Sequence, residues 1–212
     1  MQIIQIVNSL FQSNTYILSI GESIGVWLVD MGDIRPILKW MSDNGKKDVI
    51  GVLLTHTHFD HIYGLNDLRQ FFPDCYIYVA NEIGYKALFD SKLNHSKFSE
   101  IGTFTLESSN NVFRLDQMIH RIVLWKGLEG DCYPVEGHSH DSVCYHIGNY
   151  LFTGDSFIPN IRTVSKLKEG NRDEAADTVR YIVKTFDRNT FICPGHKDVC
   201  YLKAVSYTHL RA

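Results

Sequence analysis

Short apolar runs typical of β-strands occur in two blocks along the chain, and helical spacing of apolar residues follows strands in both blocks. Strands of the first block are predicted over residues 3–7, 15–20, 25–30, 48–54 and 75–80, the first three as an antiparallel meander. Strands of the second block are predicted over residues 112–115, 118–125, 131–136, 143–147, 150–153 and 190–193.

Apolar residues three or four positions apart predict helices between these strands. The predicted helices cover residues 34–43, 62–72, 82–89 and 172–186. Asp33 and Asn81 are expected to cap the first and third of them. The interval 90–111 has weak periodicity, so we expect irregular structure there with one helical turn around Phe98.

Two blocks of strands with helices after each predict an α/β fold, namely a four-layer αββα sandwich of two mixed β-sheets with outer helices. No linker composition separates the blocks, so a single domain over residues 1–205 is expected. Residues 206–212 lack periodicity and capping signals and are interpreted as a non-native tail.

The composition describes an ordinary globular protein. Its 212 residues are 44% hydrophobic, the formal net charge is −3, and the pI is about 6.3, so nothing indicates nucleic-acid binding. No targeting segment or membrane span is recognised, and five scattered cysteines without a CxxC pair favour the cytoplasm. Cys144 and Cys193 lie in predicted strands and are expected to be buried packing residues.

The strongest chemical signal is the stretch from Thr55 to His61, where an apolar strand ends in three histidines and a carboxylate. Alternate residues of an extended segment point the same way, so His56 and His58 are expected to bind one metal ion. Asp60 and His61 point elsewhere and suit a second ion beside the first. This loop therefore predicts a metal site with room for two ions.

Further ligands are expected where later strands end. His138 lies in a loop between two predicted strands and is the candidate third ligand of the first ion. Asp155 follows an apolar strand and a glycine, where a carboxylate with two oxygens can bridge two ions. His196 ends the last predicted strand.

Taken in order, the motifs His56-x-His58-x-Asp60-His61, Gly137-His138-Ser139, Thr153-Gly154-Asp155 and Pro194-Gly195-His196 resemble the metallo-β-lactamase superfamily, particularly its glyoxalase II-like hydrolase branch. The resemblance implies that three histidines bind the first metal, that three other residues bind the second, and that Asp155 bridges both. Asp60 is also expected to be catalytic. The first set is His56, His58 and His138, and the second is Asp60, His61 and His196.

The expected function is that of a dinuclear hydrolase that cleaves a small-molecule ester, thioester or lactone with a metal-activated hydroxide. The ligand set suits two divalent ions, most readily zinc, with iron and manganese open. Hydrolysis of β-lactam antibiotics is less expected, because the best-known zinc lactamases carry a cysteine where Asp155 stands. The substrate identity and the oligomeric state are not readable from the sequence.

Three other functions stay open. A mononuclear iron sulfur dioxygenase would hold iron with two histidines and a carboxylate. A phosphodiesterase or nuclease would use the same two-metal chemistry but needs a basic surface, which the net charge disfavours. A metal-binding protein without turnover is disfavoured because no ligand is missing. His95, His120 and His146 stand alone and are expected to have no functional role.

Overall fold

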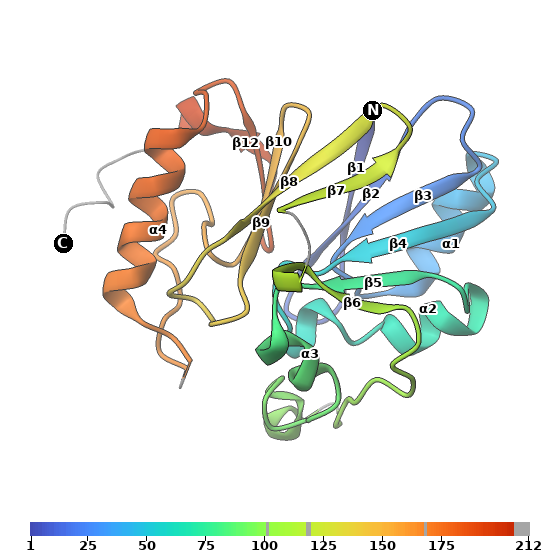
Figure 1. Cartoon of the computed structure of the whole chain (residues 1–212), viewed down its shortest axis with the longest axis horizontal. Helices are drawn as coiled ribbons and strands as arrows, with labels where there is room; N and C mark the ends of the chain where they lie inside the picture. Colours follow the sequence, from blue (N-terminus) through green and yellow to red (C-terminus); the bar gives the residue numbers. More distant parts are fainter. Residues whose placement is uncertain (101, 118–119, 168, 206–212) are drawn as a thin grey trace. The chain divides into compact units, whose positions relative to one another are not determined.

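The computed structural model describes residues 1–100, 102–117, 120–167 and 169–205. The chain divides into two compact units, Met1–Gln117 and Met118–Ala212, and each unit contains one β-sheet (Figure 1). The start of the strand predicted at residue 118 and the predicted non-native tail lie outside the described residues. The assignment of residues 1–205 to a single domain stays a prediction.

The sheet of the first unit is mixed, with its strands in chain order from one edge to the other. The first three strands pair antiparallel, as the predicted meander requires, and the next three pairings are parallel. The strands are β1 (Gln2–Val7), β2 (Asn14–Ser19), β3 (Gly25–Val29), β4 (Asp48–Leu53), β5 (Tyr76–Val79) and β6 (Val112–Arg114).

Three helices cover one face of this sheet: α1 (Ile34–Asp43), α2 (Leu65–Phe71) and α3 (Glu82–Leu88). Alternate strand residues such as Leu28, Val52 and Ile77 form a fully buried cluster with the apolar stripes of these helices. Burial of such side chains stabilises the unit by about 1.5–3 kcal/mol each. The first unit also contains three short 3₁₀ turns, at Phe59–His61, Ser96–Phe98 and Leu115–Gln117.

The two predicted helix caps differ. The Asn81 side chain accepts hydrogen bonds from the backbone of Ile83 and Gly84, which confirms the predicted cap of α3. Asp33 occupies the N-cap position of α1, but its side chain makes no capping bond, so that part of the prediction is wrong. Its carboxylate instead accepts hydrogen bonds from Ser9 and from the Tyr63 hydroxyl.

The second unit is also built on a mixed sheet, in which β10 and β11 are parallel and the other neighbours antiparallel. Helix α4 (Arg172–Thr185) packs Ile182 against Leu151 and Ile192 of this sheet. A 3₁₀ turn, Leu202–Ala204, follows the last strand. The strands are β7 (Arg121–Trp125), β8 (Leu128–Pro134), β9 (Val143–Ile147), β10 (Tyr150–Gly154), β11 (Phe191–Pro194) and β12 (Cys200–Tyr201).

Strand direction places the ends of several strands at one edge of each sheet. In the first unit β3 and β4 are parallel, so the residues after both strands share an edge. In the second unit β8 and β10 both run antiparallel to β9, and β11 is parallel to β10. The predicted ligands follow β4, β8, β10 and β11, so they gather at one edge within each unit.

All five cysteines are free thiols. Cys75, Cys132, Cys144 and Cys193 are buried, as expected for the last two from the sequence, and Cys200 is half-buried. Burial raises the pKa of the Cys75, Cys132 and Cys144 thiols to about 12. These buried thiols therefore stay protonated and unreactive in the folded chain.

No helix among the described residues combines the length and the apolar character needed to cross a lipid bilayer.

Candidate metal centre

Four of the predicted ligands lie on the loop that follows β4. The His56 and His61 side chains are fully buried, and His58 is largely buried. The His56 ring centroid lies 4.6 Å from that of His58 and 4.3 Å from that of His61. Asp60 Oδ2 lies 3.4 Å from His61 Nε2. The loop thus concentrates three imidazoles and a carboxylate, which is donor chemistry suited to zinc or another transition metal.

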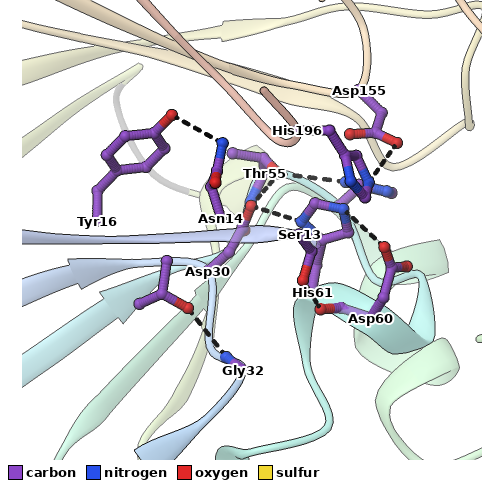
Figure 2. Close-up of polar contacts among 12 residues, drawn as sticks. Ser13, Asn14, Tyr16, Asp30, Gly32, Thr55, Asp60, His61, Asp155 and His196 are labelled. Carbon is purple, nitrogen blue, oxygen red and sulfur yellow. Dashed lines mark hydrogen bonds and ion pairs between the residues drawn. The ribbon is translucent and has the colours of Figure 1, made fainter. Parts of the chain in front are cut away.

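The loop is held by Asp30, a buried carboxylate at the end of β3 (Figure 2). Asp30 Oδ1 accepts a hydrogen bond from the Thr55 backbone at 2.8 Å, and Oδ2 accepts one from the Thr55 hydroxyl at 2.8 Å. His61 Nδ1 lies 2.9 Å from Asp30 Oδ2. Burial raises the pKa of the Asp30 carboxyl, although the neighbouring His61 opposes this shift.

These contacts fix which imidazole nitrogen carries the hydrogen. A carboxylate only accepts, so His61 Nδ1 donates to Asp30 and the lone pair of the neutral ring is on Nε2. The Thr55 hydroxyl donates its hydrogen to Asp30. In the 3.1 Å contact between Thr55 Oγ1 and His56 Nδ1, the hydroxyl oxygen is therefore the acceptor and His56 Nδ1 the donor. Both rings therefore have their free lone pair on Nε2, the arrangement that outer partners typically impose on metal-binding histidines.

Asp60 is positioned through its backbone. The Ser13 hydroxyl donates a 2.7 Å hydrogen bond to the Asp60 carbonyl oxygen (Figure 2). Ser13 lies just before β2 in a buried network in which Asn8 donates to Ser13 and Thr15. The meander at the start of the chain thus supports the loop that follows β4, which we call the ligand loop. Because Ser13 bonds the Asp60 backbone, this support does not involve the Asp60 carboxylate.

The other three predicted ligands lie together in the second unit. Asp155 Oδ2 is 3.4 Å from His196 Nε2 and 3.9 Å from His138 Nε2. His138 Nδ1 lies 2.8 Å from the Val164 carbonyl oxygen, which only accepts, so this ring also has its lone pair on Nε2. A carboxylate oxygen near two imidazoles matches the bridging role that the sequence predicts for Asp155. His140 is exposed.

Sequence reasoning missed Asp30. The available signal was its position, because Asp30 ends the apolar strand β3 as Asp155 ends β10. Its backbone φ of +57° lies in the left-handed region, which non-glycine residues adopt rarely and often at functional sites. Asp30 acts through His61 and is a positioning residue.

We expect Asp30→Asn to lower metal affinity and activity by about 10–100-fold, the usual cost of losing an outer partner. The amide can place a donor against His61 Nδ1–H, and it removes the charge that orients that ring. Asparagine tolerates a positive φ, so the backbone should persist. Metal titration together with thermal unfolding checks this; unchanged affinity in a folded Asp30→Asn protein would contradict the assigned role.

The family model of the metallo-beta-lactamase superfamily matches residues 33–196, so the chain belongs to this superfamily. A probable metallo-hydrolase of Streptococcus pyogenes serotype M6 is 26% identical over 96% of this chain and 88% of that protein. A hydroxyacylglutathione hydrolase of Hamiltonella defensa is 26% identical over 80% of this chain. The chain spans only 57% of that relative's length.

The crystal structure of the B3 metallo-beta-lactamase BLEG-1 has a similar fold, with a TM-score of 0.87, 20% identity and coverage of 100% of both chains. This likeness and the family match confirm the predicted fold class of two mixed sheets with helices. The predicted superfamily is likewise confirmed, with glyoxalase II enzymes among the relatives. Family and donor set together imply that the chain binds divalent metal.

Proposed function

We propose that this chain is a dinuclear metal-dependent hydrolase of small-molecule esters, thioesters or lactones. The observation that carries the proposal is the fixed tautomer of three histidines. His56, His61 and His138 each have Nδ1 tied to a protein oxygen, so each offers Nε2 as a ligand atom. Such control of ring orientation is the usual support of a metal site.

The proposed ligand sets are those that the resemblance implies. One ion would be held by three imidazoles, a second by two imidazoles and a carboxylate, and one carboxylate would bridge them. The sets are His56, His58 and His138; Asp60, His61 and His196; and Asp155. When bound, two such ions polarise the substrate carbonyl and lower the pKa of a coordinated water toward neutrality.

The chain's own residues complete the chemistry. Asp30 and Val164 orient imidazoles, and the buried network around Ser13 keeps the Asp60 backbone in place. The Asp60 carboxylate is only 15% exposed, and we assign it the catalytic acid–base role in addition to its role as a ligand. The elements of water add across the acyl–oxygen or acyl–sulfur bond, which yields a carboxylic acid and an alcohol or thiol.

Metal analysis of protein purified without added metal, followed by a substrate panel, tests the proposal. The panel contains a thioester, a lactone, a β-lactam and a phosphodiester. About two zinc or manganese ions per chain and hydrolysis of the thioester or lactone are expected. One iron per chain with oxygen uptake on a persulfide would replace the proposal with a sulfur dioxygenase. Hydrolysis of the phosphodiester alone would replace it with a phosphodiesterase.

A further inference from the structure

The stretch between α3 and β6 is built from turns: its described residues 91–100 and 102–104 form no strand, and turns at residues 91–94 precede the 3₁₀ turn Ser96–Phe98. Asn94 and Ser96 are fully buried in it. Asn94 Nδ2 donates to the carbonyls of Ala87 and Phe104, at 2.9 and 3.1 Å, and Asn94 Oδ1 accepts from the Ser96 backbone. Ser96 Oγ accepts from the Phe104 backbone at 2.8 Å. Buried, satisfied polar side chains of this kind specify one loop conformation.

This segment is attached directly to the ligand loop. The Phe59 backbone N–H, between His58 and Asp60, donates a 3.0 Å hydrogen bond to the Asn94 carbonyl. The next residue, His95, places its ring 5.0 Å from the His58 ring at an angle of 78°. His95 has a φ of +65°, a conformation that non-glycine residues adopt rarely. The rigid segment thus places the His95 imidazole in contact with His58, a predicted metal ligand.

The same short turn exposes an aromatic side chain. Phe98 is 73% exposed, more than any other large apolar side chain among the described residues, and its ring lies 6.3 Å from His95. An exposed phenyl ring gains nothing from core packing, yet here a buried network holds its turn in place. Neighbouring Leu93 is 42% exposed. Two exposed apolar side chains, Leu93 and Phe98, therefore lie on a preformed segment that is bonded to the His58 loop, where they are available to an apolar group.

From this arrangement we propose that His95 and Phe98 bind the apolar acyl group of the substrate, which makes esters and thioesters of medium-chain or aromatic acids the preferred class. The inference rests on the proposed hydrolase function. The acyl chain would pack on the Phe98 ring. The His95 ring, which packs against His58, would restrict the orientation of the acyl chain relative to the metal site. Both are specificity-determining residues, and neither is required for cleavage of a short acyl group.

The test compares two substrates with one leaving group, p-nitrophenyl acetate and p-nitrophenyl hexanoate, on zinc-loaded protein. Wild type is expected to favour hexanoate in kcat/KM. Phe98→Ala is expected to lower the hexanoate-to-acetate ratio about tenfold, through a higher KM for hexanoate, since added methylenes lose their apolar contact. Phe98→Leu should restore most of the ratio. Phe71→Ala, which removes an exposed phenylalanine from α2, is the matched control and should leave the ratio unchanged.

Different failures have different meanings. Hydrolysis of both esters with the same ratio in wild type, Phe98→Ala and Phe71→Ala would overturn this inference and leave the proposed function standing. A Phe98→Ala protein of smaller mass in light scattering than wild type would also overturn it, because Phe98 would then bind a second copy of the chain. Zinc-loaded wild type that hydrolyses no member of the ester and thioester panel would overturn the proposed function itself.

Discussion

His58→Ala is expected to lose the first metal ion and to reduce kcat/KM well beyond the about 100-fold that removal of an outer partner costs. His58 is a predicted ligand in its own right, and no other described imidazole of unit 1 occupies its place between His56 and His95. The fold should persist, because the His58 backbone carbonyl still accepts the hydrogen bond from the His61 N–H. Metal content and steady-state kinetics measure the loss, and far-UV circular dichroism follows the fold.

His120→Ala is the matched control, since it removes an exposed histidine side chain of the second unit. The hydrogen bond from the Cys132 N–H to the His120 backbone carbonyl is kept in this variant. Its metal content and activity should equal those of wild type. Full activity in His58→Ala would refute the assignment of the ligand loop. Equal losses in both variants would mean that any histidine substitution disturbs the preparation, and the assignment would then lose its support.

Asp60→Ala is expected to remove one of two metal equivalents and to lower kcat by at least about a hundredfold. Only the second ion uses this carboxylate in the proposed ligand sets, so the first ion should remain. Ser13 bonds the Asp60 carbonyl rather than its side chain, so the loop should hold its conformation. Titration with zinc, monitored by calorimetry, separates the two binding events.

Asp67→Ala, at an exposed carboxylate in the first turn of α2, provides the control for lost negative charge and should retain both ions. Retention of both ions in Asp60→Ala would remove Asp60 from the ligand set. Wild type and Asp60→Ala that both bind one ion equally tightly would instead argue against a dinuclear centre.

The sequence predicted most of the sheet and helix framework because its signals are local. Apolar runs end in Asn, Gly or Pro, and these boundaries agree with the observed strands to within a few residues. The helix predicted from Ile62 begins instead at Leu65. Long-range backbone bonds explain this difference, because the Met31 N–H donates to His61 and the Gly64 N–H donates to Met31. The hairpin at Gly127 and the two-residue strand β12 were also missed.

Predicted ligands were recognisable from spacing and strand ends, whereas their supporting residues were not. Asp30 lies 31 positions before His61 in the chain, and only the pairing of β3 with β4 brings the two together. His95 was predicted to have no role, yet its ring contacts that of His58. A lone histidine in an aperiodic segment carries no sequence signal. The position of the His95 ring beside His58 depends on the hydrogen bonds that the buried Asn94 and Ser96 side chains make, and these bonds cannot be read from the sequence. Tertiary hydrogen bonds therefore limit what one sequence reveals about a site.

The buried thiols provide a natural reporter of local opening. Cys75 lies in the first unit, and Cys132, Cys144 and Cys193 lie in the second, so each half of the molecule carries its own. A thiol reagent applied to native protein should modify half-buried Cys200 first and reach the others only when their unit opens. Mass spectrometry of pulse-labelled protein would then give separate opening rates for the two halves, with and without bound metal, and no cysteine would have to be introduced.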